Sequence, residues 1–434
     1  MKISILLPYK ENFSPDYPGA VSLFVYETSK ISKFKKLITV YGNTNFKKKF
    51  DIKYINIDLK KDLFTSQTKL YVKKFIKLEK IFKSSIIEVH NRPSYVHILN
   101  NELKNKIFTL YFHNDPLSMD GSKTIEQRKK LLRTCYKIIF NSAWSKKRFL
   151  EGLENKFVNS NKLLIFYQSA KKANLSIINR KNKWITFVGK LNRAKGYDIF
   201  AKSITKILEK NSSWKAIIIG DEKREKIFLK HKNATIMGFK KHEEVLNIFK
   251  KTSITVACSR WEEPFGRTSL EASANGCAVI ITNKGGLPET VTDAKIIKKL
   301  TVKSLTENIS LLINNVNLRK KLQRLSIKNF YLTHKFVSDN IDNYRSEKLF
   351  IQKKFFLKSK QKSLRILHVT NFNERLDGRL FFNTGRRINN GFIRLGHSVL
   401  GFSDRDIQKY YKSIGDFKGS NILNDKLKKT CYNY

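Results

Sequence analysis

The carboxylates of Glu263 and Glu271 stand close to a glycine turn in the segment Ser259–Glu271, which reads SRWEEPFGRTSLE. The segment follows a short apolar run, turns at Pro264 and Gly266, and continues in a helical pattern. A glycine at the head of a helix lets backbone N–H groups face an anion, and the helix dipole favours negative charge there. Glu263 and Glu271 flank the turn, and carboxylates beside an anion site need hydroxyl donors. The segment predicts a phosphate site next to sugar or ribose hydroxyls; the competing interpretation is a solvated, ordinarily capped helix start.

A second segment whose residues could bind a ligand is Phe187–Asp198, FVGKLNRAKGYD, which again has the pattern of a strand, a glycine turn and a helix. Lys195 lies at the helix entrance, where a cation joins the backbone in holding a diphosphate. Lys190 and Arg193 lie in the same turn. The competing interpretation is that all three are ordinary surface cations among the 86 lysines and arginines of the chain.

Together the two segments resemble signatures of the retaining GT-B glycosyltransferases of family four, the glycosyl transferases of group 1. Ser259–Glu271 resembles the family pattern E-P-F-G-x-x-x-x-E. The resemblance implies that Glu263, Phe265 and Gly266 contact the donor sugar. It also implies that Glu271 holds the nucleotide ribose, with Arg267 in the same donor-binding stretch.

The loop at Phe187–Asp198 resembles the family pattern V-G-R-x-x-x-x-K-G-x-x, whose Arg and Lys hold the donor diphosphate. Lys195 matches the family Lys. Lys190 stands where the family usually has Arg, a departure that matters because Lys cannot form the bidentate fork of a guanidinium. Arg193 is the alternative cation for that role.

Weaker elements of the resemblance lie at other strand ends and loops. Ile219–Asp221 and Ile236–Phe239 end two predicted strands, and the resemblance places such ends, Gly238 included, around the nucleobase. Gly19 precedes a helical run and stands where the family has a glycine-rich loop near the donor phosphates. Glu289, in the family-like loop GGLPE, is interpreted as structural rather than catalytic.

His90 and His113 each end a predicted buried strand, in EVHNRP and LYFHND. The carboxyl ends of parallel strands face the ligand crevice of an α/β sheet, and a histidine there can donate to an oxyanion or polarise a hydroxyl. The resemblance favours His113 as a residue that touches the donor, so Glu263, Lys195 and His113 form the predicted catalytic set. Asn114–Pro116 offers a single carboxylate and no Asp-x-Asp pair, and no metal site is predicted.

Short, mostly continuous apolar runs alternate with amphipathic helical stretches, as in parallel sheets whose strands are buried on both faces. This alternation occurs twice and predicts two doubly wound domains of the GT-B type that face each other across a cleft. The predicted strands are Lys2–Leu7, Leu37–Tyr41, Ser85–His90, Ile107–His113, Lys137–Phe140, Trp184–Val188, Ala216–Ile219, Ala234–Met237, Ser253–Ala257 and Ala278–Ile281.

Four parts are predicted along the chain. Residues 1–170 form the acceptor-side domain and residues 171–345 form the nucleotide-sugar domain with its closing helices. Residues 346–363 form a basic linker. Residues 364–434 form a partial, truncated glycosyltransferase-like α/β unit, with a strand at Leu364–Asn371, a helix at Phe381–Leu395 and Gly396 at the end of that helix.

The formal net charge of +50 is extreme. It favours polyanionic partners such as nucleotide diphosphates or an anionic membrane surface, and it is equally explained by a lysine-rich composition spread over many helices. No nucleic-acid motif accompanies the charge, so no nucleic-acid partner is predicted. The four cysteines have no metal or redox spacing and are expected to be buried thiols in a reducing compartment.

The apolar stretch at the start is too short for a signal peptide, and the chain is expected in the cytoplasm, peripheral to the inner face of the membrane. The predicted function is transfer of a sugar from a nucleotide diphosphate donor to a saccharide or lipid-linked acceptor in cell-envelope polysaccharide or lipopolysaccharide synthesis. The donor is a co-substrate, and no resident cofactor is expected. The alternatives are a nucleotide-sugar epimerase or phosphorylase on the same fold, a decayed transferase acting as a binding or scaffold protein, and, from charge alone, nucleic-acid binding.

Overall fold

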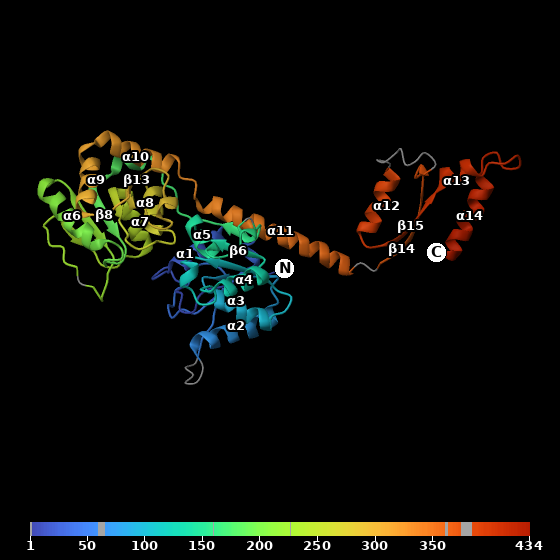
Figure 1. Cartoon of the computed structure of the whole chain (residues 1–434), viewed down its shortest axis with the longest axis horizontal. Helices are drawn as coiled ribbons and strands as arrows, with labels where there is room; N and C mark the ends of the chain where they lie inside the picture. Colours follow the sequence, from blue (N-terminus) through green and yellow to red (C-terminus); the bar gives the residue numbers. More distant parts are fainter. Residues whose placement is uncertain (1, 60–65, 159, 226, 361–362, 375–383) are drawn as a thin grey trace. The chain divides into compact units, whose positions relative to one another are not determined.

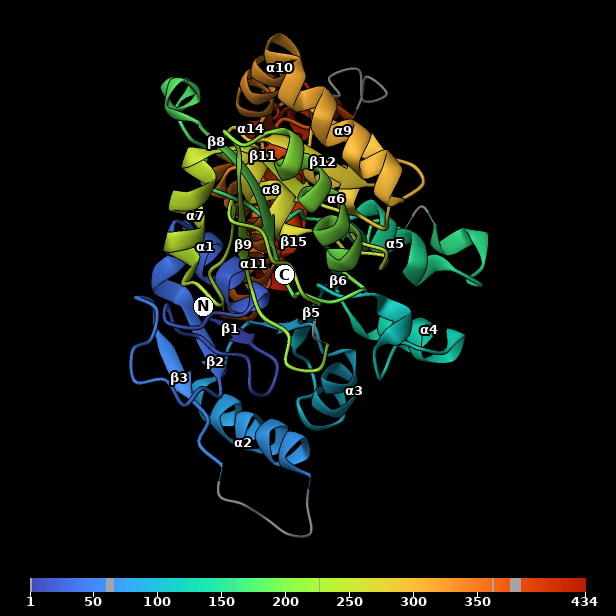
Figure 2. The same ribbon diagram turned by 90° about the vertical axis from the view of Figure 1, so that its left-hand side faces the viewer.

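The computed structural model describes residues 2–59, 66–158, 160–225, 227–360, 363–374 and 384–434, with only the backbone described for 348–360. The chain divides into two compact units, Met1–Arg345 and Ser346–Tyr434. The first unit contains two parallel sheets, and we call each sheet with its helices a lobe (Figures 1 and 2).

The first lobe holds a seven-stranded parallel sheet of order β3-β2-β1-β4-β5-β6-β7. Its strands are β1 (Ile3–Leu6), β2 (Ile38–Gly42), β3 (Tyr54–Asn56), β4 (Ile86–His90), β5 (Ile107–Phe112), β6 (Lys137–Phe140) and β7 (Leu163–Ile165). Its helices are α1 (Ala20–Lys30), α2 (Gln67–Phe82), α3 (Pro93–Glu102), α4 (Ile125–Thr134) and α5 (Ala143–Leu150).

The second lobe holds a six-stranded parallel sheet of order β10-β9-β8-β11-β12-β13. Its strands are β8 (Asn182–Val188), β9 (Lys215–Ile219), β10 (Ala234–Ile236), β11 (Thr252–Ala257), β12 (Ala278–Thr282) and β13 (Ala294–Ile297). Its helices are α6 (Tyr197–Lys210), α7 (His242–Lys251), α8 (Arg267–Ala274), α9 (Val302–Asn314) and α10 (Val316–Lys328).

Both sheets are covered on both faces, which explains the continuous apolar runs. In the first lobe, alternate strand residues join α2 to α5 in one large apolar cluster. In the second lobe, one face packs with α6 and α9 and the other with α7 and α8. Because successive strand residues point to opposite faces, a polar residue between two core residues lies on the other face of the sheet.

Helix α11 (His334–Lys360) leaves the second lobe and packs on the first. Arg345 Nη2 and Nε donate to both carboxylate oxygens of Glu88 on β4, at 2.6 and 2.8 Å. The Tyr344 hydroxyl also donates to Glu88. The side chains of Arg345 and Glu88 are almost fully buried. The Glu88 carboxylate therefore has several charge-assisted partners, which is the condition under which a buried ion pair is tolerated.

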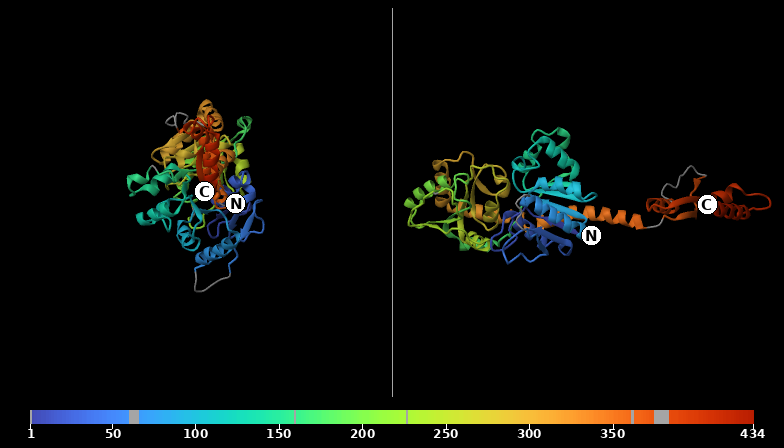
Figure 3. Two further views of the ribbon diagram at one scale, coloured as in Figure 1. Left: turned by 90° about the vertical axis from the view of Figure 1, so that its right-hand side faces the viewer. Right: turned by 90° about the horizontal axis from the view of Figure 1, so that it is seen from below.

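The second unit contains the two-stranded parallel sheet of β14 (Arg365–Thr370) and β15 (Ser398–Ser403). Helix α12 (Thr384–Arg394) lies on one side of the strands, with α13 (Asp404–Tyr410) and α14 (Ser420–Asn433) on the other (Figures 1 and 3). Gly396 follows α12 with φ +90°, as predicted for a helix-ending glycine. The first part of the predicted helix, 381–383, lies outside the described residues.

The prediction of two parallel-sheet α/β domains is confirmed, and the predicted strands match observed strands to within two residues at each end. Residues 346–360, predicted as a linker, continue helix α11. Cys431 is exposed, so the prediction of four buried thiols is wrong for this one, because it lies on α14, a helix none of whose residues is buried. Within the described part of the chain, no helix has both the length and the apolar character of a membrane span.

Candidate functional site

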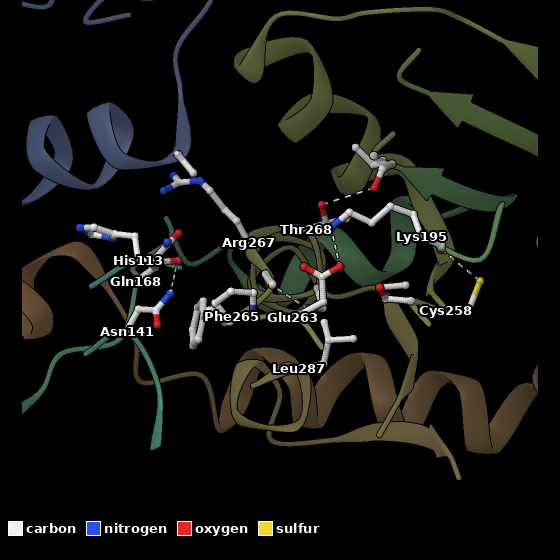
Figure 4. Close-up of a pocket in the computed structure, with 18 of the residues that line it drawn as sticks. His113, Asn141, Gln168, Lys195, Cys258, Glu263, Phe265, Arg267, Thr268 and Leu287 are labelled. Carbon is white, nitrogen blue, oxygen red and sulfur yellow. Dashed lines mark hydrogen bonds and ion pairs between the residues drawn. The ribbon is translucent and has the colours of Figure 1, made fainter. Parts of the chain in front are cut away.

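A cavity of about 270 Å³ lies between the two lobes, at the carboxyl ends of their strands (Figure 4). Both lobes line it. The first lobe contributes Ala20, His113, Asn114, Asn141 and Gln168, and the second contributes residues of Phe187–Lys195, Ala257–Ser259 and Glu263–Ser269 together with Leu287. The carboxyl edge of a parallel sheet is where α/β folds bind ligands.

Lys195 and Glu263 meet in this cavity as an ion pair between Lys195 Nζ and Glu263 Oε1 (Figure 4). Lys195 follows β8, and its backbone N–H donates to Asn192 Oδ1 at 3.0 Å. At the next residue, a Cβ on Gly196 would collide with the carbonyl of Cys258, and its φ is +72°. Only glycine fits there, so the Lys195 loop lies directly against the strand that precedes Glu263.

The amino end of α8 forms one wall of the cavity. Its N-cap is Gly266, with φ +123°. Among the described residues, no side chain accepts a capping hydrogen bond at this end of the helix. The first N–H groups of a helix have no intrahelical acceptor, and the macrodipole is positive there. Phe265 is buried and lines the cavity beside them. This wall can therefore hold an anion next to the Lys195 cation.

Arg267, the first residue of α8, lies in a cluster of charges that joins the lobes. Its Nη2 donates to both oxygens of Glu27 on α1, each at 2.8 Å, and its Nε donates to Glu271 Oε1 at 2.6 Å. His242 Nε2 lies 2.7 Å from the same Glu271 oxygen. Burial disfavours the Arg267 cation, but the two carboxylates outweigh it and raise its pKa.

Glu271 is buried and does not line the cavity. Burial by itself would raise its pKa, but Arg267 and then His242 outweigh burial and lower it. Glu27 and His242 line a separate cavity of about 500 Å³ between α1 and α7. The Arg267 cluster thus stands between two cavities.

His113 follows β5 and forms a buried pair with His90, the last residue of β4. His90 Nδ1 and His113 Nε2 are 3.1 Å apart. Burial lowers the pKa of His90 to about 3, with a smaller contribution from Arg345, and burial followed by His90 lowers the pKa of His113. Both imidazoles are therefore neutral at pH 7, and His113 lines the cavity as an uncharged group.

The first lobe also brings polar residues for which the sequence predicted no role in the site. Asn141 follows β6, and its Nδ2 donates to the carbonyl of His113 at 2.9 Å. Gln168 and Asn114 line the cavity beside it. These three residues share only their position, because each follows a strand of the same sheet. Predicting them from the sequence would have required the order of the strands in that sheet.

The remaining predicted residues lie outside the cavity lining. Lys190 and Arg193 are exposed, and the Arg193 backbone N–H donates to Glu225. Gly19 is the N-cap of α1 and adjoins the lining residue Ala20. Gly238, with φ +64°, accepts a hydrogen bond from the Gly220 N–H at 2.9 Å. Roles for these four in donor binding stay predictions. The described residues contain no cluster of three His, Cys, Asp or Glu able to hold a metal ion.

Residues 169–328 match the family model of the glycosyl transferases group 1. The chain is 23% identical over 361 residues to Spore coat protein SA of Bacillus subtilis, covering 75% of this chain and 93% of that protein. It is 29% identical over 120 residues to the lipopolysaccharide core biosynthesis mannosyltransferase LpsB of Rhizobium meliloti, covering 25% and 34%.

Among solved structures, Anabaena Alr3699/HepE in complex with UDP superposes with a TM-score of 0.64 at 16% identity, covering 80% of this chain and all of that one. Sucrose-phosphate synthase from Thermosynechococcus elongatus superposes with a TM-score of 0.60 at 14% identity, covering 81% and 100%. At these identities the likeness concerns the fold.

Proposed function

The chain is a glycosyltransferase of group 1 with the GT-B fold, and on that premise we propose that it transfers a sugar from a nucleoside diphosphate donor to an acceptor hydroxyl with retention of configuration. The observation that carries this proposal is the meeting of Lys195, Glu263 and the uncapped amino end of α8 in one cavity between the lobes. A cation and free N–H groups suit a diphosphate, and a carboxylate suits sugar hydroxyls.

In the proposed reaction, the bond between the anomeric carbon and the diphosphate oxygen breaks, and the acceptor oxygen bonds to that carbon on the same face. Positive charge develops on the sugar and negative charge on the leaving diphosphate. Lys195 and the N–H groups after Gly266 stabilise the diphosphate, and the Glu263 carboxylate holds the sugar. The leaving phosphate oxygen takes the acceptor proton, so no side chain is assigned as general base.

The neutral first-lobe groups suit the rest of the substrate. His113, Asn114, Asn141 and Gln168 offer hydrogen bonds without charge, as hydroxyl groups of a donor sugar or an acceptor require. Because both lobes line the cavity, a donor bound there lies between them, which reduces its contact with water and so its hydrolysis.

For the biological role, we propose synthesis of a cell-envelope saccharide, on a saccharide or lipid-linked acceptor. The Bacillus relative is named as a spore coat protein and the Rhizobium relative as an enzyme of lipopolysaccharide core biosynthesis. The formal charge of +50 supports peripheral contact with an anionic membrane, which we place at the inner, cytoplasmic face.

A thermal-shift screen tests the proposal. UDP-glucose, GDP-mannose, ADP-glucose and a CMP-sugar are added to the full chain, to Lys195→Ala, and to Lys202→Ala as a matched control on the exposed side of α6. A ligand at a hundred times its Kd stabilises a fold by about 2.7 kcal/mol. We expect one nucleotide family to raise the melting temperature of the wild type and of Lys202→Ala, and not of Lys195→Ala.

The selected donor is then incubated with saccharide acceptors, and proton NMR determines the anomeric configuration of the product. A retained configuration supports the proposed stereochemistry. An inverted product would overturn it, free epimerised sugar would indicate an epimerase, and no shift with any nucleotide would contradict donor binding.

A further inference from the structure

Helix α5 of the first lobe has its amino end satisfied by a residue of the second lobe. The Ala143 and Trp144 N–H groups donate to Glu289 Oε2 and Oε1, at 2.6 and 2.9 Å. The next N–H, of Ser145, donates to the N-cap Ser142 Oγ at 2.9 Å. A carboxylate at this position is favoured by the helix dipole as well as by the two hydrogen bonds. Glu289 therefore links the lobes through the backbone of α5.

The segment Gly285–Glu289 also packs on the backbone of the loop Glu263–Gly266. The Gly286 N–H donates to the Glu263 carbonyl at 2.6 Å. A Cβ on Gly285 would collide with that same carbonyl, and one on Gly286 would lie 2.6 Å from the Pro264 carbonyl oxygen. Side chains are excluded at both glycines, so backbone lies directly on backbone. The position of Glu263 thus depends on where Gly285–Glu289 lies.

Helix α5 completes a three-way junction. Ser142 Oγ donates to the Pro264 carbonyl at 2.6 Å, and Ser145 Oγ lies 3.4 Å from the same oxygen. The start of α5 therefore contacts both the Glu289 carboxylate and the residue that follows Glu263. Glu289 is half-buried and lies near Tyr167. The burial of Tyr167, and to a smaller extent the Glu289 carboxylate, raise the pKa of Tyr167 to about 12.

We propose that Glu289 is a positioning residue for the transfer reaction: by binding the amino end of α5 it holds the Glu263–Gly266 loop in its reactive position when the lobes are together. This inference rests on the proposed function for the identity of the reaction. It assigns Glu289 no contact with the substrate, since Glu289 is not among the residues lining the catalytic cavity. A misplacement of catalytic groups by about 1 Å lowers rates severely, which is why a remote link affects chemistry.

Hydrogen exchange on the full chain tests the link without any substrate. Glu289→Gln keeps the size of the side chain, but one N–H of α5 then faces an amide NH₂ instead of an oxygen. The matched control is Glu126→Gln, which removes an acidic residue from the first turn of α4 within a single lobe. We expect Glu289→Gln to speed exchange at Ala143–Trp144 and also in Ser259–Glu271. Faster exchange confined to α5 would mean an ordinary helix cap and would overturn the inference.

Kinetics with the nucleotide sugar selected by the thermal-shift screen provide the second readout. We expect Glu289→Gln to lower kcat about tenfold, with a change in donor Kd of less than about twofold. A kcat equal to that of Glu126→Gln would contradict the positioning role. If the wild type binds no nucleotide sugar, the proposed function fails, and the exchange experiment still decides the link.

Ser142→Ala tests the same junction from the α5 side, through the Pro264 carbonyl. Residues that act through one junction have non-additive effects. We expect the double variant with Glu289→Gln to lose little more activity than Glu289→Gln alone. Fully additive losses would show two independent contacts and would overturn the shared role. Should Glu289→Gln fail to fold, exchange in Ser259–Glu271 of Ser142→Ala decides the matter in the same way.

Discussion

The two lobes line one cavity with different chemistry. The second lobe brings the charged groups Lys195, Glu263 and Arg267 and the positive end of α8. Among the described lining residues, those of the first lobe are uncharged, and the titratable one, His113, is kept neutral by burial and by His90. The difference indicates a division of work, in which one lobe holds the charged part of a ligand and the other holds its hydroxyl groups.

The division follows from how each lobe is built. Lys195 and the α8 terminus lie on loops held by glycines at close backbone contacts, which fixes charges in place before a ligand arrives. Such preorganised charge contributes most to a reaction that develops an anion. Neutral hydrogen-bond groups contribute less to rate, because their net strength in water is about 0.5–1.5 kcal/mol.

The largest expected effect is a difference in transfer activity between substitutions in the second lobe and substitutions in the first. We expect Lys195→Ala to lower kcat/KM for transfer by about 10²–10³-fold, as for the loss of a group that stabilises the leaving anion. Asn141→Ala, which removes an uncharged first-lobe group, is expected to lower it by about tenfold or less. Initial rates with the selected donor measure both, and Lys202→Ala is the control. Equal losses for Lys195 and Asn141 would break the comparison.

The sequence predicted the parts of the fold that are fully buried. Runs such as Ala278–Ile281 are apolar at every position because helices cover both faces of the strand. In the first unit the missed strands are β3, β7 and β13, which are three or four residues long and whose residues are mostly only partly buried. Edge strands need fewer apolar residues, so composition alone does not distinguish them from loops.

The candidate site was predictable where chemistry and local structure coincide in one segment. Lys195 and Glu263 were both predicted, but their contact joins loops 68 residues apart and depends on β8 and β11 being neighbours in the sheet. Asn141 and Gln168 belong to no local pattern. Glu27 and His242 lie on helices as ordinary polar residues, and only lobe packing brings them to Arg267 and Glu271.

Glu27 is a first-lobe carboxylate outside this cavity, and it binds the second-lobe Arg267. Hydrogen bonds between charged groups contribute about 1.5–3 kcal/mol, so we expect Glu27→Gln to lower the free energy of unfolding by about 2 kcal/mol. Urea unfolding followed by tryptophan fluorescence measures this in the first unit, since Trp144, Trp184, Trp214 and Trp261 all lie there. Exposed Glu209→Gln on α6 is the control. Equal stability of the two variants would show that this ion pair does not hold the lobes together.

The third effect is the smallest at neutral pH, because the His90–His113 pair lowers the stability of the fold only on acidification. Burial lowers the pKa of His90 to about 3, whereas an unfolded histidine titrates near 6.5. Between these values the unfolded chain binds a proton that the folded chain does not. Stability is therefore complete above pH 6.5 and falls below it, by up to about 1.4 kcal/mol per pH unit for each such histidine. Unfolding at pH 7, 6 and 5, followed by tryptophan fluorescence, should show a smaller acid loss for His90→Asn than for the wild type or for His231→Asn. An unchanged slope in His90→Asn would mean that His90 is protonated in the folded chain, and the first lobe would then carry charge next to the cavity.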